Sequence, residues 1–357
     1  MGRVFLKRPL QVNVKNFIKG LIPPLMWNLV KLILSISTYK AILKAIVPPF
    51  LFQLLKKLLY LGKDPDDMEG ENRLLRSQEF WTGHNVTFHR KFNSAEESLR
   101  NFRLRCVKYI DYLTLMPVDK ADGKVILDYG CGPGHDLVGI AHYSKPERII
   151  AMDVSSPSLD EARERIALHH KDVDFILIHE DDERLPLEDE SVDIIHCSGV
   201  LHHTPDPVKI LKEFRRILKS DGYAQVMVYN YDSIFMHLYT AYIVQTDQVL
   251  LANLDKRKAF SKLTDTRSCP ISECYTTEEF TTIVNRAGLA CTYKGASISL
   301  FEMNLLPRRF DAIQNDALND ESRDFLLELL FDKDGKPIYR GHVAGIDGCY
   351  ILRKTDR

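Results

Sequence analysis

The stretch from Val125 to Asp136, VILDYGCGPGHD, constrains what this chain can fold into more than any other part of the sequence. It opens with three apolar residues, a run short enough for a buried strand. An acid and three alternating glycines follow, and glycines at a strand end allow a sharp turn and a close approach of the backbone to a ligand. Apolar residues at 137, 138, 140 and 141 then lie largely on one face of a helix. A strand, a glycine-rich turn and a helix start together predict a cradle for a nucleotide.

The spacing of the glycines indicates which kind of nucleotide. The dinucleotide fingerprint G-x-G-x-x-G, counted from Gly130, needs a glycine where the chain has His135, and counted from Gly132 it needs one where the chain has Leu137. The pattern present is D-x-G-x-G-x-G, and it resembles the first motif of the class I S-adenosylmethionine (SAM) dependent methyltransferases, of the methyltransferase type 11-like kind. The resemblance implies that Asp128 and the glycines lie against the methionine half of SAM. His135, where the dinucleotide fingerprint needs a glycine, disfavours a nicotinamide dehydrogenase.

Two acids follow at the positions that this family uses. The run Arg148–Asp153 ends about 20 residues after the glycine turn, where an adenosine-binding fold places a carboxylate on the ribose hydroxyls. A third apolar run follows, and the family pattern then has an acid four residues before Leu-Pro that contacts the adenine amino group. In this sequence that acid is Asp181, with Asp182 as the alternative.

A fourth apolar run, Ser191–Cys197, is followed by Ser-Gly-Val-Leu-His-His, which resembles the family's motif after its fourth strand. The pieces span about 80 residues in the correct order, and the set is specific although each piece alone is common. The resemblance implies SAM as the cofactor. It also implies a set of cofactor-binding residues, namely Asp128, Gly130, Cys131, Gly132, Gly134, Asp153, Val154, Asp181, Asp182 and Ser198.

Helix-length patterns at Ser156–His169 and Pro207–Leu218 separate the strands, and Tyr223–Tyr231 reads as a fifth strand. Strands that alternate with helices predict a parallel sheet with helices on both faces. The predicted fold class is α/β, a Rossmann-like, doubly wound, mostly parallel seven-stranded sheet with an N-terminal helical extension. The predicted domains are a basic, apolar helical repeat arm at 1–63, a linker and helical cap at 64–120, the SAM-binding core at 121–231, and an acceptor-site insertion with the remaining strands at 232–357.

Within the cap, a helix is expected to begin after Ser94 and to run to about Leu115. Aromatic and imidazole side chains in and before it are expected either to line a lid over the site or to pack in a core, namely Trp81, His84, His89 and Tyr109. Near the C-terminus, glycines at 341 and 345 around His342 predict a loop that returns to the active site before a last strand.

His202 and His203 follow the fourth strand at the carboxyl edge of the sheet, where open α/β sheets bind ligands. Methyl transfer from a sulfonium is an in-line displacement in which an enzyme aligns donor and acceptor and, for a hydroxyl acceptor, supplies a base. The ordinary pKa of histidine suits that role. Both histidines are therefore candidate catalytic residues, and the alternative is that they only pack beside the cofactor.

Residues 1–63 contain eleven Lys and Arg and no Asp or Glu, whereas the formal net charge of the whole chain is −1. This asymmetry predicts a basic arm that meets an anionic partner. Two similar segments, KNFIKGLIPPLMWNLVKLILS and KAILKAIVPPFLFQLLKKLLY, recur in it. In each, a Pro-Pro pair precedes an apolar stretch, as in a first helical turn, so each copy is predicted to be a helix–Pro–helix unit.

Lysines and proline pairs interrupt every candidate membrane span in this arm. Apolar faces bordered by lysines instead predict helices that lie in an anionic membrane interface. The alternative is that they pack on the protein's own core or form a homodimer. Seven scattered cysteines favour reduced thiols in a cytosolic setting and predict no metal site. The expected location is the cytoplasm, with the inner face of the membrane as the peripheral site for the arm.

These features predict a SAM-dependent methyltransferase that acts on an oxygen of a saccharide, a lipid-linked intermediate or another small metabolite. The basic arm favours a lipid-linked glycan as the acceptor. Two alternatives stay open: a soluble natural-product methyltransferase whose arm serves oligomerisation, and a SAM-binding scaffold protein without turnover. Nucleic acid is disfavoured as a partner because the basic residues are mixed with long apolar runs, whereas a phosphate-binding stripe is more polar.

Overall fold

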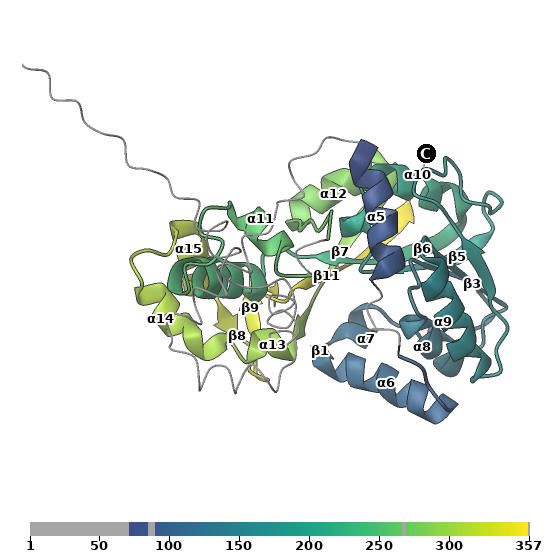
Figure 1. Ribbon diagram of the computed structural model, residues 1–357, viewed down its shortest axis with the longest axis horizontal. Coiled ribbons are helices and arrows are strands. Elements are labelled where there is room, and N and C mark those ends of the chain that lie inside the picture. Colours follow the sequence, from purple (N-terminus) through teal and green to yellow (C-terminus); the bar gives the residue numbers. More distant parts are fainter. Residues whose placement is uncertain (1–70, 85–89, 266–268, 356–357) are drawn as a thin grey trace, which may run out of the picture. The chain divides into compact units, whose positions relative to one another are not determined.

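The computed structural model describes residues 71–84, 90–265 and 269–355, so the predicted arm at 1–63 lies outside the described residues. Contacts divide the chain into two units, Met1–Pro65 and Asp66–Arg357, and the described residues all belong to the second. Its main sheet is formed by β1 (Tyr109–Ile110), β2 (Val125–Tyr129), β3 (Arg148–Asp153), β4 (Asp174–Leu177), β5 (Val192–Ser198), β6 (Leu218–Tyr229), β7 (Leu289–Ser299) and β11 (Asp347–Lys354). Across the sheet the order is β1-β7-β11-β6-β5-β2-β3-β4 (Figure 1).

Five of these strands run parallel from β4 to β6, and β11 lies antiparallel between β6 and β7. The seven longer strands confirm the predicted α/β, Rossmann-like, doubly wound and mostly parallel sheet. The eighth strand, β1, has two residues and was not predicted. Because β11 is antiparallel to its neighbours, its first residue lies at the edge where the parallel strands end.

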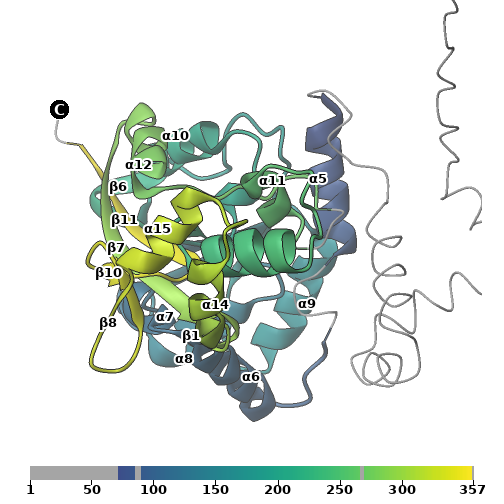
Figure 2. The same cartoon turned by 90° about the vertical axis from the view of Figure 1, so that its left-hand side faces the viewer.

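Helices cover both faces of the sheet, as Figures 1 and 2 show. On one face lie α6 (Ala95–Lys108), α8 (His135–Tyr143) and α9 (Ser156–Ala167), and on the other lie α10 (Pro207–Ile217) and α12 (Thr277–Arg286). Consecutive strand residues divide between the two layers: Ile126 packs with the first group of helices and Leu127 with the second. This alternation is the two-residue period of a strand that is buried on both faces.

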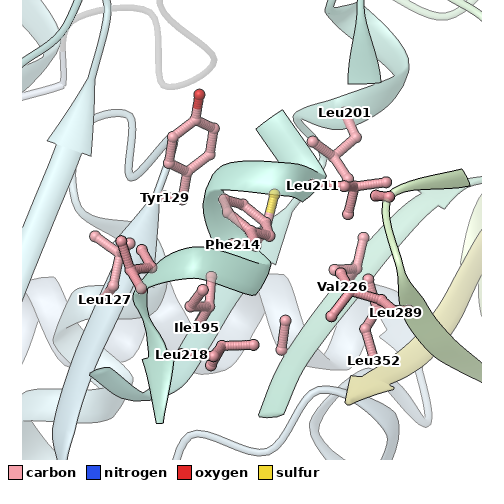
Figure 3. Close-up of a cluster of buried hydrophobic side chains, with 14 of the residues drawn as sticks. Leu127, Tyr129, Ile195, Leu201, Leu211, Phe214, Leu218, Val226, Leu289 and Leu352 are labelled. Atoms are coloured by element: carbon pink, nitrogen blue, oxygen red, sulfur yellow. The ribbon is translucent and has the colours of Figure 1, made fainter. Parts of the chain in front are cut away.

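The layer under α10 and α12 is an apolar core (Figure 3). Leu211, Phe214 and Ile217, on one face of α10, are fully buried against strand residues such as Ile195 and Val226. Burying a side chain of this size contributes about 1.5–3 kcal/mol. This packing fixes β5 and the start of α10, and with them the loop between, which carries His202 and His203.

The predicted continuous helix from Ala95 to about Leu115 is wrong. The chain leaves the helix after Lys108, forms β1, and turns at Asp111 into α7 (Tyr112–Leu115). Asp111 has a φ of 67°, a left-handed conformation that a helix interior does not accommodate. The pairing of β1 with the far end of β7 stabilises this break, and a partner so distant in the sequence leaves no local pattern.

A second, smaller core follows β6 and packs η3 (Phe235–Asp247), α14 (Arg309–Gln314) and α15 (Asp320–Glu328) against the end of β7. The predicted return loop around His342 is instead strand β10 of a three-stranded sheet.

No helix in the described ranges is long and apolar enough to cross a membrane. The remaining elements are α5 (Glu71–Gly83), the 3-10 helices η2 (Leu201–His203) and η4 (Leu306–Arg308), the π-helix η3 (Phe235–Asp247), α11 (Lys256–Ser261), α13 (Leu300–Met303), α14 (Arg309–Gln314), α15 (Asp320–Glu328), β8 (Leu330–Phe331), β9 (Pro337–Tyr339) and β10 (His342–Val343).

Candidate active site

A cavity of about 740 Å³ lies at the carboxyl ends of the parallel strands, a volume typical of small-molecule sites. It lies where β2 and β5 meet, which is the point at which the strand order reverses and at which open α/β sheets bind their ligands. Most residues that were predicted to bind the cofactor line it. They are Asp128, Gly130, Cys131, Gly132, Asp153, Val154, Asp181, Asp182 and Ser198; Gly134 does not line it.

The glycine turn follows β2 and has φ values of 72°, 51° and 77° at Gly130, Gly132 and Gly134. These left-handed conformations favour glycine. A Cβ at position 130 would collide with Val200, and one at position 134 would come within 3.3 Å of Ala162. Gly132 thus borders open space, Gly130 makes room for the Val200 side chain, and Gly134 allows close packing of α8 on α9.

Asp153, at the end of β3, holds the turn in place. Its Oδ2 accepts a hydrogen bond from the Gly132 amide at 2.8 Å and its Oδ1 accepts one from the Ser155 amide at 2.8 Å. Burial raises the pKa of Asp153, and these backbone donors oppose that rise. Each carboxylate oxygen has two lone pairs, so Asp153 keeps acceptor capacity for the ribose hydroxyls that it was predicted to bind.

Asp128 is the least satisfied acid of the cavity. Its residue exposure is 3%, and its Oδ2 is buried without a hydrogen-bond donor among the described residues. Burial raises the pKa of this carboxyl to about 7. A buried carboxylate without a partner is costly, so a cationic or hydrogen-bonding ligand group would stabilise the site.

At the other end of the cavity lie the acids that follow β4. Asp182 accepts a hydrogen bond from the His179 amide at 2.8 Å, and the Asp181 carbonyl accepts one from Lys209 at 3.2 Å. Glu180 was not predicted, because the family pattern counts back only to Asp181. Its Oε2 is buried without a partner among the described residues, and burial raises its pKa to about 7.

The two histidines occupy different environments. His203 lines the cavity, and its Nδ1 donates to the Ile271 carbonyl at 2.8 Å. His202 does not line the cavity; it is fully buried, its two nitrogens have no hydrogen-bond partner among the described residues, and its ring lies 3.9 Å from that of Tyr229. Burial lowers the pKa of His202 well below its ordinary value. The geometry therefore favours His203 over His202 as a base.

Asp265 lies beside His203 and was not predicted. Its Oδ2 is 3.5 Å from His203 Nε2. It also accepts a hydrogen bond from the Tyr229 hydroxyl at 3.0 Å and one from Ser272 at 3.3 Å. Burial, followed by the charge of Asp265, raises the pKa of Tyr229 well above its ordinary value, so that hydroxyl stays protonated and donates.

One further acid at this end comes from the last strand. Asp347 begins β11, lies opposite Tyr229 of β6 and lines the cavity. Burial raises its pKa to about 7. Arg105, on α6, lines the same region. No motif marks these residues, and only the antiparallel placement of β11 and the packing of α6 bring them to the site.

Comparison with known families identifies the domain that contains many of the residues lining this cavity. Residues 127–226, which contain the glycine turn, Asp153, the acids after β4 and both histidines, match the family model of the methyltransferase domain. The chain carries a class I SAM-dependent methyltransferase domain.

Individual relatives each match part of this chain. An uncharacterized 37.1 kDa protein in a transposon of Streptomyces fradiae is 39% identical over 107 residues, which are 29% of this chain and 30% of that protein. A malonyl-acyl-carrier-protein O-methyltransferase of Marinomonas is 31% identical over 135 residues, 38% of this chain and 48% of that enzyme. The solved structure of a SAM-dependent methyltransferase from Mesorhizobium loti aligns at 16% identity with a TM-score of 0.41, covering 68% of this chain and 97% of that one. The chain thus spans less than half the length of these two relatives known from sequence.

The residues of the methyltransferase domain fit SAM as a ligand. Asp128, whose Oδ2 has no donor among the described residues, suits the cationic amino group of the methionine half, and the turn borders open space at Gly132, where a Cβ would meet no atom within 4 Å. Asp153 lies on the adjacent strand with acceptor capacity for ribose. When bound, SAM supplies an electrophilic methyl group on a sulfonium.

Proposed function

We propose that this domain transfers the methyl group of SAM to a hydroxyl oxygen of a small acceptor, namely a saccharide, a lipid-linked intermediate or another small metabolite. The observation that carries the proposal is the pairing of His203 with Asp265 at a cavity wall. An O-methyltransferase needs a base at the acceptor oxygen, and these two residues form an acid-paired imidazole that faces open space.

The hydrogen bonds of His203 assign its tautomer. Because Nδ1 donates to the Ile271 carbonyl, Nε2 is left with the lone pair. As the bond between the acceptor oxygen and the methyl carbon forms, the hydroxyl proton passes to Nε2. The carboxylate of Asp265, 3.5 Å away, stabilises the resulting imidazolium, and Tyr229 and Ser272 hold that carboxylate in place. SAM would supply the methyl group, and its sulfur would keep the electron pair of the broken C–S bond.

The wall around His203 suits a hydroxylated acceptor. The rings of Trp81, Tyr109 and Tyr229 and the carboxylates of Asp265 and Asp347 line it. Aromatic faces cover the apolar side of a sugar ring, and carboxylates accept hydrogen bonds from hydroxyls. This combination supports a saccharide-like acceptor, whether free or linked to a lipid.

We also propose that residues 1–63 bring the enzyme to an anionic membrane surface at the cytoplasmic face, where a lipid-linked glycan would be presented. What supports this is the sequence: eleven basic residues, no acidic ones, and two repeated apolar segments with lysines at their borders. The competing role for these residues is a homodimer contact, which the deletion experiment of the Discussion distinguishes.

The test combines binding and transfer. Calorimetric titration of SAM and S-adenosylhomocysteine into the full chain is followed by transfer of a radiolabelled methyl group to a panel of saccharides, lipid-linked saccharides and small alcohols. We expect SAM binding by the wild type, and we expect His203→Gln to bind SAM within about twofold of wild type but to transfer about 10²–10⁴-fold more slowly. His142→Gln, exposed at the end of α8, is the matched control and should behave as wild type.

Either of two results would contradict this function. Folded wild type that does not bind SAM would exclude a SAM-dependent enzyme. Wild type that binds SAM but methylates no hydroxyl would support the scaffold alternative instead.

A further inference from the structure

The cavity is strongly acidic. Among the described residues that line it, ten side chains are acidic and two, Arg105 and Lys209, are basic. The protein itself engages both basic groups: Arg105 Nη1 donates to Asp136 at 3.1 Å, and Lys209 donates to the Asp181 carbonyl at 3.2 Å. A cavity of this charge disfavours an anionic acceptor and attracts a cationic one.

Asp347 is an acid at the wall around His203 whose carboxylate accepts no hydrogen bond and forms no ion pair among the described residues. The residue is 4% exposed, and burial raises its pKa to about 7 against the opposing charge of Arg105. Asp265, at the same wall, is instead bound by the Tyr229 hydroxyl at 3.0 Å. Because a buried carboxylate without donors is costly, a ligand group that supplies donors and positive charge would be stabilised at Asp347.

Strand pairing places Asp347 beside aromatic side chains of this wall. Asp347 pairs with Tyr229 of β6 on one side and with Ser297 of β7 on the other. Tyr109 of β1 pairs with Ser299, two residues further along β7. Residues that pair, or that lie two apart on one strand, project from the same face of a sheet. Asp347, Tyr109 and Tyr229 therefore lie together at one edge of the sheet, and all three line the cavity.

A carboxylate among aromatic rings is suited to an ammonium group. The ammonium supplies three donors and a full charge, and the faces of aromatic rings attract cations. A hydroxyl supplies one donor and no charge. An acetamide on the acceptor would leave the Asp347 carboxylate without a cation, so the same residue would discriminate against it.

We propose that the acceptor is an amino alcohol of the amino-saccharide class, and that Asp347 binds its ammonium group while His203 takes the proton of the hydroxyl that is methylated. This inference rests on the proposed function. Asp347 is then a specificity-determining residue that comes from β11, outside the matched segment 127–226. Charge-assisted hydrogen bonds of this kind are short and strong, so the ammonium would orient the acceptor as well as bind it.

The test compares acceptors that differ in one substituent. Glucosamine, glucose and N-acetylglucosamine, and the three matching galactose sugars, carry an amine, a hydroxyl or an acetamide at one carbon. The full chain is assayed as wild type, Asp347→Asn and Asp119→Asn for transfer of a radiolabelled methyl group, and by calorimetry for sugar binding with saturating S-adenosylhomocysteine. Asp119 is exposed and does not line the cavity, so its substitution is the matched control.

We expect wild type to prefer the amine over the acetamide about 10- to 100-fold in kcat/KM and in Kd, the range of a hydrogen bond to a charged group. The preference should lie mainly in KM, because the ammonium is bound equally in the ground state and the transition state. Asp347→Asn should reduce the preference to less than about threefold. Asp119→Asn should keep the preference of wild type.

Three outcomes would overturn the assignment. Wild type that binds no amine-bearing sugar, or that takes the acetamide as well as the amine, would do so without any variant, which covers the case in which Asp347→Asn fails to fold. An unchanged preference in folded Asp347→Asn would remove Asp347 from the acceptor. A loss of affinity for SAM but not for S-adenosylhomocysteine in Asp347→Asn would place the carboxylate against the sulfonium instead.

Failure of the proposed function has a different signature. Wild type that binds SAM but methylates no hydroxyl would contradict O-methylation. Preferential binding of the amine-bearing sugars, and its loss in Asp347→Asn, would still support a cation subsite at Asp347.

Discussion

The buried carboxylate of Asp128 has an oxygen, Oδ2, that accepts no hydrogen bond from the described residues. Burial raises the pKa of Asp128 from 3.8 to about 7, so the folded state holds this proton more tightly than the unfolded state does. The corresponding stability is present below about pH 4 and is lost as the pH rises through about 7. Asp128→Asn, an uncharged residue of the same shape, should therefore gain stability relative to wild type as the pH rises, by roughly 1–3 kcal/mol at pH 8.

Urea denaturation of ligand-free protein at pH 5 and pH 8 measures this difference. The control is Asp119→Asn, at an exposed carboxylate that lies 3.3 Å from the Lys120 ammonium. A stability difference between wild type and Asp128→Asn that is the same at both pH values would contradict the prediction. The same variant should bind SAM more weakly, because it lacks the anion for the ammonium group.

Single residues also show which parts of the site could be predicted from the sequence. The motif residues Asp128 and Gly130 lie at the cavity because they belong to one strand–turn–helix unit, and Asp153 lies there because β3 pairs in parallel with β2. Asp265 and Arg105 could not be predicted, since they come from a loop and a helix that have no motif and reach the site only through packing. The two histidines illustrate a further limit: they are adjacent in the sequence and both are buried in η2, but of the two only His203 lines the cavity.

At the scale of secondary-structure elements, α5 contacts residues at both ends of the cavity. Ser77 donates to the His203 carbonyl at 3.4 Å, Gln78 is hydrogen-bonded to the His179 ring at 3.1 Å, and the Trp81 ring lies 4.8 Å from the His203 ring. Trp81 also lines the cavity. The helix therefore contacts both the loop after β5, which carries His203, and the loop after β4, which carries Asp181 and Asp182.

Because Trp81 lines the cavity, we expect ligand binding to change its fluorescence. The chain has two tryptophans, Trp27 and Trp81, so Trp27→Phe leaves Trp81 as the reporter. Adding S-adenosylhomocysteine to this variant should change the intensity or the wavelength of tryptophan emission, because the ligand fills the space that the ring lines. The matched variant Trp81→Phe should show no change at the same saturation, confirmed by calorimetry. An unchanged Trp81 signal on saturation would place α5 away from the ligand.

The secondary-structure elements also show why the strands β2, β3 and β5 were predicted correctly and the helix that begins at Ala95 was predicted too long. β2, β3 and β5 are runs of apolar residues bounded by turns, and each is buried on both faces. The segment after Ala95 instead reads as helical beyond Lys108, yet Tyr109 and Ile110 pair with Ser299 and Ile298 of β7. Pairing with a distant strand outweighs local helical preference there, and only the three-dimensional fold reveals the partner.

At the scale of the whole molecule, residues 1–63 (the arm) and the remaining residues carry net charges of opposite sign. Beyond residue 63 the chain has 37 Lys and Arg against 49 Asp and Glu, while the first 63 residues are entirely basic among their charged side chains. An acidic enzyme would be repelled by an anionic surface, so a membrane-facing role requires a segment of opposite charge.

Deleting residues 1–63 tests the role of the arm. Full-length protein should sediment with vesicles that contain anionic lipid and not with neutral vesicles, and salt should weaken this binding because the charges are screened. The deletion variant should lose at least about tenfold in vesicle affinity, given about 1 kcal/mol for each basic residue near the surface, while its calorimetric affinity for SAM stays within about twofold of the full chain. Undiminished vesicle binding after deletion would contradict the membrane role. Loss of a dimer in light scattering, with no vesicle binding by either form, would instead assign these residues to oligomerisation.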